Sequence, residues 1–355
     1  MNAKETDPLL LISTDWHLDK NNTEVIKDLV IQKCELAVKL GLPGFFILGD
    51  IFDSRKGQEL IVLDALLEIL ELITVEYGLY VTILPGNHDK VSYQSESSYL
   101  ASFQYMENVQ YVKDYFVFKN YGKSDVNVYL LPFFSEETWL RYYTEMLENF
   151  PLDKKKKNIL LTHTAFSNSI NNDGSKVTNS SINYSLLKDW DLVLSGHYHD
   201  FQQPFKNTFH LPSIRQKNFG ENGNKGFTIV NKDLTLTIDK ADFPKFVTRT
   251  INLSETSLSE IKEIAEGYKD GNSNVRIILE GPIELVQAFN SQELEILGIS
   301  VKKKNPDIDT SMEYAETCDQ IEELTQDRIV DLFKDFCENE NLDFEEGLEY
   351  LKNGR

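Results

Sequence analysis

Five apolar segments of this chain each end in a short polar loop that carries aspartate, asparagine or histidine. The segments cover residues 9–13, 45–48, 79–84, 158–162 and 192–194. Apolar runs of this length predict short, buried strands. Five of the six histidines lie in the loops that follow these segments. This recurrence restricts the chain to folds in which the ends of several strands meet.

Helical patterns alternate with these segments in the first half of the chain. Residues 22–40 and 59–74 carry apolar side chains at helical spacing, and 41–44 contain the glycine and proline that end the first helix. Strand, polar loop and helix in repeated order predict an α/β sandwich. Further expected elements are a strand over 126–131, a helix over 138–149, a polar loop over 167–181, and a hairpin formed by 227–230 and 234–238.

Two smaller regions follow the sandwich. After a linker at Phe243 and Pro244, the pattern predicts helix over 258–268, strand over 274–279, helix over 282–290 and strand over 295–303. These elements would form a small α+β unit. Residues 309–351 predict two amphipathic helices in an acidic tail. The expected domains are therefore 1–242, 243–304 and 305–355.

Composition excludes several classes of protein. The net charge of −21 (36 basic against 57 acidic side chains) argues against broad, nonspecific adhesion to nucleic acid or to anionic membranes. The three cysteines are too scattered for a disulfide framework. The first apolar run is too short for a signal peptide or a membrane span. We expect a cytoplasmic protein that does not associate with membranes.

The polar loops carry the chemistry of a metal site. Side chains at the carboxyl ends of strands in an α/β sheet meet at one edge. Oxygen and imidazole donors suit Mn²⁺, Fe or Zn rather than a thiolate zinc site. Taken singly, each residue is more often a turn, cap or surface residue, but the repetition favours a site. The candidate ligands are Asp15, His17, Asp50, Asn87, His163, His197 and His199.

Seven ligands exceed the needs of one metal, so two metals that share a carboxylate are expected. Two ions about 3.5–4 Å apart can hold a hydroxide and clamp a phosphate for in-line attack. Asp50 is the expected bridge, because a short carboxylate beside a glycine can contact both ions. His88 can stay free while Asn87 is a ligand, and pairing with Asp89 would keep it protonated as an acid.

Two further residues have expected supporting roles. Asp53 is expected to orient a metal ligand rather than to bind the metal itself. His210 falls outside the loop pattern and is expected to be structural.

The loop motifs together resemble those of the calcineurin-like metallophosphoesterases. They are Asp-x-His at 15–17, Gly-Asp-x-x-Asp at 49–53, Gly-Asn-His-Asp at 86–89, His163, and Gly-His-x-His at 196–199. Within that superfamily the chain is most similar to the SbcD-type DNA repair nucleases of bacteria and phages. The features that carry this likeness are Gly-Asp-Ile-Phe-Asp at 49–53, Ser213, Phe219-Gly-Glu at 219–221, Lys-Gly-Phe at 225–227, and the layout of the last hundred residues.

The resemblance implies a fold and an assignment of the site. The fold would be a four-layer α/β/β/α sandwich with a small α+β capping domain and a C-terminal helical tail. One metal would be held by Asp15, His17, Asp50 and His199. The other would be held by Asp50, Asn87, His163 and His197. His88 would be the catalytic acid and Asp89 its orienter.

The resemblance also implies a function. The chain would be a DNA exonuclease or endonuclease with two Mn²⁺ ions (Mg²⁺, Fe or Zn being alternatives), acting in double-strand break repair, recombination or replication. The capping domain would position DNA, and the tail would bind an SbcC-like coiled-coil ABC ATPase. A homodimer would form through 58–78 and 90–106. The protein would be nucleoid-associated, or in the host cytoplasm if phage-encoded.

Two features depart from this pattern, and two other functions compete with it. Pro212 stands where the family often has glycine, and the acidic charge implies weak DNA binding without the ATPase. A small-molecule or cyclic-nucleotide phosphodiesterase or phosphatase could use the same site, but would not need the last hundred residues. A non-catalytic regulatory subunit is the third reading, against which the intact ligand set argues.

Overall fold

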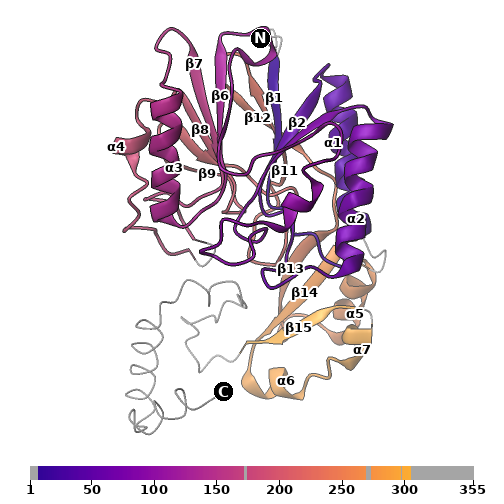
Figure 1. The fold of residues 1–355 in the computed structure, drawn as a ribbon. Helices are drawn as coiled ribbons and strands as arrows, with labels where there is room; N and C mark the ends of the chain where they lie inside the picture. Colours follow the sequence, from indigo (N-terminus) through magenta and orange to yellow (C-terminus); the bar gives the residue numbers. More distant parts are fainter. Residues whose placement is uncertain (1–6, 172–173, 269–272, 297, 305–355) are drawn as a thin grey trace, which may run out of the picture. The chain divides into compact units, whose positions relative to one another are not determined.

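Two six-stranded sheets form the centre of the protein. The computed structural model describes residues 7–171, 174–268, 273–296 and 298–304 (Figure 1). The first sheet has the order β12-β11-β1-β2-β3-β4, and the second has the order β5-β6-β7-β8-β10-β9. Among the described residues no helix is both long and apolar enough to span a bilayer.

The first sheet is parallel over four strands and antiparallel at one side. Its register pairs Ile12 with Phe46, and Ile47 with Ile83, so neighbouring strands end at the same level. Its strands are β1 (Pro8–Ser13), β2 (Gly44–Leu48), β3 (Tyr80–Leu84), β4 (Val109–Tyr111), β11 (Gly226–Asn231) and β12 (Leu236–Lys240).

The second sheet repeats this plan. Its central strands β6, β7, β8 and β10 run parallel, and an antiparallel strand closes each side. The strands are β5 (Phe116–Phe118), β6 (Val126–Leu131), β7 (Lys157–Thr162), β8 (Leu192–Ser195), β9 (Gln202–Phe205) and β10 (Thr208–His210).

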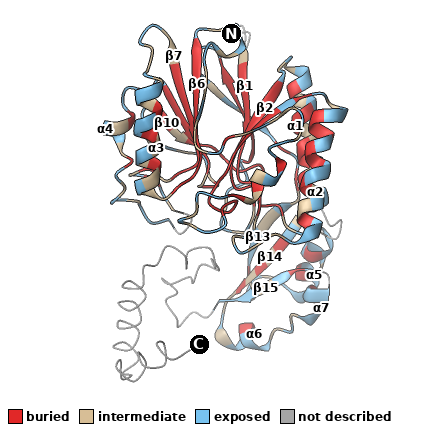
Figure 2. Ribbon diagram, in the orientation of Figure 1, coloured by how far each residue is buried: buried red, intermediate tan, exposed pale blue. Residues whose placement is uncertain are grey.

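Helices cover the outer face of each sheet, as the buried (red) strands and partly exposed helices of Figure 2 show. Phe45 and Ile47 pack towards the helices, whereas Phe46 and Leu48 on the same strand pack in the cluster between the sheets. Both faces are therefore apolar, which explains the continuous runs in the sequence. The covering helices are α1 (Thr23–Lys39), α2 (Leu60–Glu71) with a π turn η1 (Leu72–Glu76), α3 (Glu136–Asn149) and α4 (Tyr184–Leu187).

These layers confirm the predicted α/β/β/α sandwich. The segment between β3 and β6 contains the short 3₁₀ turns η2 (Tyr99–Phe103) and η3 (Tyr121–Lys123) as well as the strands β4 and β5.

Residues 245–303 form a smaller α+β unit, here called the cap. Its parallel sheet has the order β13-β14-β15, and its own apolar cluster includes Ile251, Ile261 and Ile277. The bounds are β13 (Lys245–Asn252), α5 (Leu258–Glu266), β14 (Ser273–Glu280), α6 (Ile283–Ala288), α7 (Gln292–Ile296) and β15 (Ser300–Lys303).

One expectation for this region is wrong, and one strand was not predicted. The strand predicted over 295–303 is only β15, because the glutamate- and leucine-rich residues before it form the helix α7. Strand β13 was not predicted, since its outward side chains are polar and partly exposed. Phe243 and Pro244 lie in the connection between β12 and β13, and the Phe243 side chain is 6% exposed and packs in the core beside α1 and α2. The predicted tail helices lie outside the described residues.

Candidate metal centre

The predicted ligands converge at the carboxyl ends of the central strands. The loops after β1, β2, β3, β7 and β8 supply them, and parallel register brings those ends to one edge. Asp15, His17 and Asp50 are at most 2% exposed, and His163 is fully buried. A polar cluster this deep in a sandwich requires partners for every donor and acceptor.

The backbone at the site is held in unusual conformations. Asp15, His17, Asp50 and His197 all have positive φ, between 50° and 87°. This left-handed region is costly for residues other than glycine, and such residues cluster at functional sites. The loops turn sharply at these positions, which aims the side chains inward.

Glycines allow the loops to approach one another. A Cβ on Gly86 would lie 2.1 Å from Asp50 Oδ1 and 2.3 Å from the Asp50 nitrogen. A Cβ on Gly196 would lie 2.0 Å from Thr14 Oγ1, and Gly49 combines a φ of +83° with similar crowding. Any larger residue at these positions would separate the loops that carry the ligands.

One group of donors consists of Asp15, His17 and His199, whose candidate ligand atoms lie within 4.8 Å of one another. His17 Nε2 and His199 Nε2 are 2.9 Å apart. Burial, followed by Lys217, lowers the pKa of His17 well below its usual value, so this imidazole is neutral. Burial would lower the pKa of His199, but Glu221 and Asp15 outweigh it and raise that pKa, so the His199 ring would lose a proton when it binds a cation together with His17.

The second group is built around Asp50 and His163. His163 Nε2 lies 3.3 Å from Asp50 Oδ1 and 3.1 Å from Asn87 Oδ1. His197 Nδ1 is 2.9 Å from the same Asn87 oxygen. Asp15, Asp50 and His163 also form a group within 4.8 Å, so the two sets of donors are contiguous.

The donor chemistry fits divalent cations. Burial would raise the pKa of Asp50, but His163 and His88 outweigh it and hold that pKa well below its usual range. His17 Nδ1 is buried and lies 3.2 Å from Asp53 Oδ1, which leaves Nε2 to face the other donors. Carboxylates, an amide oxygen and imidazoles suit Mn²⁺, Fe or Zn. Asp15, His17 and His199 would hold one ion, and Asn87, His163 and His197 the other, while the bridging role of Asp50 stays a prediction.

His88 lies at the edge of this cluster. Its Nδ1 donates to the carbonyl oxygen of Asp53 at 2.6 Å, and its Nε2 is 3.1 Å from Arg55 Nη2. The same Nε2 is 3.9 Å from Asp50 Oδ2. Burial, opposed by Asp50 and aided by Arg55, lowers the pKa of this imidazole. The ring is therefore oriented by a backbone carbonyl and presents Nε2 towards the site.

Asp89 has a different set of partners from the expected one. It is fully buried and accepts hydrogen bonds from the amides of Phe52 and Gly86, at 3.0 and 2.8 Å. Burial and the nearby Asp50 raise its pKa to about 7. These bonds fasten the loop after β2 to the loop after β3, while the Asp53 carbonyl is the group that orients His88.

His210 and Asp53 lie beside the predicted ligands. His210 is buried between Ser169 Oγ, 2.8 Å from Nε2, and the Gly196 carbonyl, 2.9 Å from Nδ1. Burial lowers its pKa to about 3, so it is a neutral structural residue. The Asp53 carboxylate is behind His17 and pairs with Lys217 Nζ at 2.8 Å.

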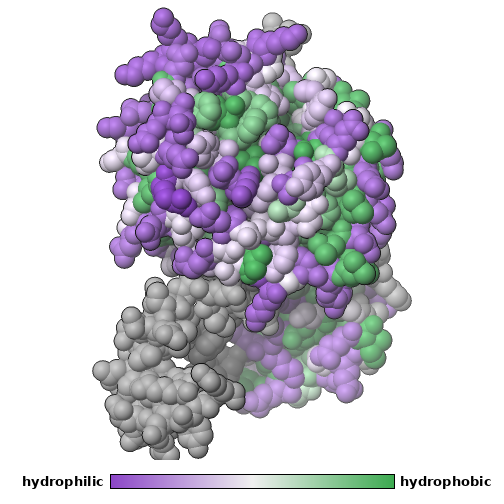
Figure 3. All heavy atoms as spheres, in the orientation of Figure 1, coloured by the Kyte–Doolittle hydropathy of each residue, from purple (hydrophilic) through white to green (hydrophobic). Residues whose placement is uncertain are grey.

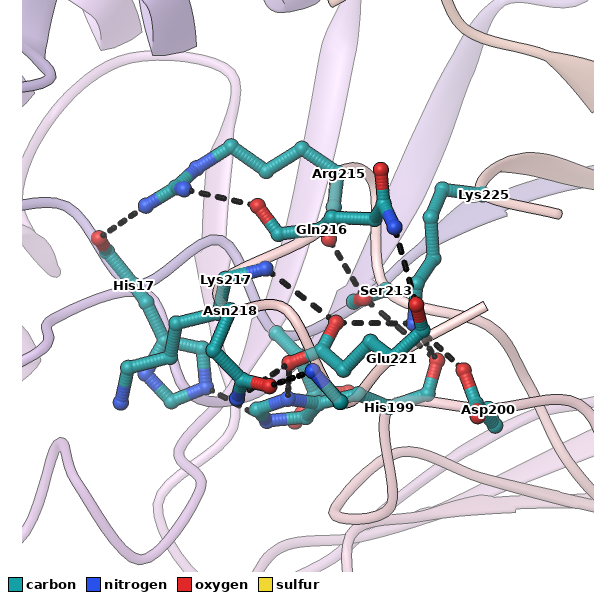
Figure 4. Close-up of polar contacts among 12 residues, drawn as sticks. His17, His199, Asp200, Ser213, Arg215, Gln216, Lys217, Asn218, Glu221 and Lys225 are labelled. Carbon is teal, nitrogen blue, oxygen red and sulfur yellow. Dashed lines mark hydrogen bonds and ion pairs between the residues drawn. The ribbon is translucent and has the colours of Figure 1, made fainter. Parts of the chain in front are cut away.

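The structure adds residues that the site assignment from sequence had missed. Glu221 Oε1 lies 2.8 Å from His199 Nδ1, and Arg215 donates to the backbone carbonyl of His17 (Figure 4). Arg55, Lys217 and Lys225 are further basic residues near these donors. The only signal for Glu221 in the sequence was its place in the Phe-Gly-Glu motif, which carries no indication of its partner.

Comparisons with known proteins agree with this geometry. Residues 9–201 match the family described as calcineurin-like phosphoesterase. The chain is 25% identical over 309 residues to the protein named "Putative phosphoesterase 244L" of Invertebrate iridescent virus 6, covering 80% of this chain and 98% of that protein. A crystal structure of a dimetal phosphatase from Danio rerio matches with a TM-score of 0.42 and 11% identity over 63% of this chain and 93% of that one, a likeness too low to carry an argument.

The close approach at Gly86 generates a prediction. Gly86→Ala places a methyl group against the Asp50 backbone, so the loops must separate and Mn²⁺ affinity should fall at least tenfold, as measured by isothermal titration calorimetry. Gly223→Ala is the matched control, because a Cβ there meets nothing within 4 Å. Equal Mn²⁺ affinity in the two variants would show that the crowding at Gly86 is tolerated.

Proposed function

The chain belongs to the calcineurin-like phosphoesterase family, and on that basis we propose that it is a Mn²⁺-dependent DNA nuclease. The family makes it a metal-dependent phosphoesterase. The proposal narrows this activity to phosphodiester bonds of DNA, with roles in double-strand break repair, recombination or replication. The observation that carries it is the convergence of two contiguous groups of metal donors with an oriented imidazole beside them.

In this proposal the bound cations supply positive charge against the phosphate oxygens. The protein contributes their positions and a proton. His88 Nδ1 is committed to the Asp53 carbonyl, so an acid role requires the ring to be protonated on both nitrogens, with Nε2 as the atom that would give a proton to the leaving oxygen. Burial and Arg55 oppose this doubly protonated form, whereas the nearby Asp50 favours it. Nε2 faces Arg55 and Asp50 at the edge of the predicted metal donors, so the imidazole would be beside the bound cations.

A polyanionic substrate is supported by the charge around the site. Arg55, Lys217 and Arg215 lie at this edge of a chain whose net charge is −21. Basic side chains beside a metal site favour substrates that carry phosphates on either side of the reacting one. This local charge, together with the resemblance to SbcD-type nucleases, favours DNA over a small phosphate ester.

The dimer expected through residues 58–78 is supported by exposed apolar side chains. Leu60 is 72% exposed, Ile61 55% and Val75 76%, along α2 and η1. Figure 3 shows apolar (green) surface on the side of the molecule where α2 lies. Exposed apolar residues gathered on one helix mark an interaction surface, and we propose that a second copy of the chain covers it.

The acidic residues 309–355 are proposed to bind an SbcC-like ATPase. This proposal rests on the layout that the chain shares with SbcD-type nucleases, since these residues lie outside the described part of the structure.

Substitutions at the site separate metal binding from chemistry. His88→Ala should keep Mn²⁺ but lower cleavage of end-labelled duplex DNA by about 10²–10⁴-fold, the contribution of a general acid. Asp50→Ala should lose both metal and cleavage.

Undiminished cleavage by the His88→Ala variant would exclude His88 as the acid. Full activity on p-nitrophenyl phosphate with no cleavage of DNA by the wild type would favour a small-molecule phosphatase.

The dimer surface can be tested without touching the site. The double substitution Leu60→Asp with Ile61→Asp should convert the protein from dimer to monomer in light scattering, because charges would replace the apolar contact. Ile170→Asp is the control, because the Ile170 side chain is also exposed, at 52%, but lies on a loop outside α2, and this variant should remain a dimer. A wild-type protein that is monomeric at all concentrations would contradict the proposal.

The ATPase interface has a separate test. Deletion of residues 309–355 should abolish co-purification with a co-encoded coiled-coil ATPase, while Mn²⁺-dependent hydrolysis of bis-p-nitrophenyl phosphate continues. Co-purification of the shortened protein would show that the ATPase binds elsewhere.

A further inference from the structure

The segment between β10 and β11 supports both imidazoles that face one of the two cation positions. This segment, residues 213–225, is here called the return segment. Glu221 Oε1 lies 2.8 Å from His199 Nδ1. Lys217 Nζ lies 2.8 Å from Asp53 Oδ1, which is itself 3.2 Å from His17 Nδ1. One short stretch of chain thus stands behind both His17 and His199.

These contacts determine which nitrogen of each imidazole is available. A carboxylate at Nδ1 holds the proton there, so the lone pair is on Nε2 and the ring cannot rotate freely. The two Nε2 atoms are 2.9 Å apart and aimed at the same point. The carboxylates of Asp53 and Glu221 therefore orient the two rings towards one cation.

The charge of Glu221 is balanced within the return segment. Its side chain is 6% exposed, and its Oε2 lies 2.9 Å from Nζ of Lys225, which is fully buried. Lys225 also contacts Asp200 Oδ1 at 2.8 Å and donates to the His199 carbonyl at 2.7 Å (Figure 4). A buried carboxylate with this partner keeps its position, which suits it to hold an imidazole.

The imidazoles at the other cation position are held differently. His163 Nδ1 donates to the backbone carbonyl of Leu48 at 2.6 Å, and His197 Nδ1 lies beside Asn87 Oδ1. These contacts come from the loops of the sandwich and involve no residue of the return segment. A change in the return segment should therefore affect one cation more than the other.

The same segment is fastened to the cap. Gln216 Oε1 accepts a hydrogen bond from the Phe246 amide on β13 at 3.1 Å, and Gln216 Nε2 donates to the Glu221 carbonyl at 2.9 Å. The Phe219 ring packs edge-on against Phe246 at 5.0 Å, and the Arg276 guanidinium of β14 lies 4.0 Å from the centre of the Phe219 ring. Gln216 therefore links the start of the cap strand β13 to Glu221, the residue that contacts His199.

We propose that the return segment is a positioning clamp for the cation bound by His17 and His199, and that the cap controls this clamp through Gln216. This inference rests on the two-cation site of the proposed function. Its consequence is that a substrate contacting the cap would alter the affinity of one cation and leave the other unchanged. Glu221 and Gln216 are thus positioning residues, since they act through His199.

The test is a Mn²⁺ titration of the full chain by calorimetry, with electron paramagnetic resonance to detect two coupled ions. Wild-type protein should bind two ions and give the coupled spectrum. Glu221→Ala should weaken one ion by about 10–100-fold, the usual effect of removing such a partner, and lose the coupled spectrum. Glu221→Gln keeps an acceptor for His199 Nδ1 and should restore much of the affinity. Gln216→Leu should give an intermediate loss.

Asn224→Ala is the matched control, because Asn224 is an exposed residue of the same segment. Two ions bound with wild-type affinity in Glu221→Ala would overturn the clamp. Gln216→Leu retains Glu221, so it tests the link to the cap even if Glu221→Ala does not fold. Two ions bound with wild-type affinity in Gln216→Leu would overturn control by the cap. Failure of the wild type itself to bind two ions would instead overturn the proposed function on which the clamp rests.

Discussion

The burial of carboxylates beside imidazoles at one end of a sandwich is the constraint on which the rest of the structure depends. Asp15 and Asp50 lie at most 2% exposed within one cluster with His163, where water cannot screen their charge. Such a cluster is stable only when cations or tightly matched hydrogen bonds offset the charge. The positive φ angles and the contacts at Gly86 follow from this need, because they bring the donors within reach of one another.

The two cation positions differ in what supports them. The sandwich provides backbone and loop partners for His163 and His197, whereas His17 and His199 depend on carboxylates held by the return segment. A sandwich core is close-packed and changes little in shape. A loop joined to a second unit can respond to what that unit binds. In the proposed clamp, this asymmetry would leave one cation fixed by the fold and make the binding of the other depend on the cap.

The distribution of charge fits a phosphate-directed enzyme that does not adhere to polyanions in general. The chain has a net charge of −21, whereas the basic side chains Arg55, Lys217 and Arg215 are near the metal donors. Binding would then depend on the cations and on these few contacts rather than on a broad basic face. The acid proposed for the reaction, His88, is oriented by a backbone carbonyl, which a substitution of a side chain cannot remove.

The sequence alone determined the central strands of the sandwich and the polar residues at their ends, because a buried strand and the polar loop after it are contiguous in the chain. The apolar run at 126–131 coincides with β6, and every predicted ligand lies in the cluster or beside it. Only the tertiary structure decided what stands behind those ligands. Glu221 contacts His199, which is 22 residues earlier in the chain, and Lys217 of the return segment pairs with Asp53 of the loop after β2. Asp89 accepts hydrogen bonds from backbone amides rather than contacting His88. Such contacts leave no periodic pattern in a sequence, since they depend on how separate loops pack together in space.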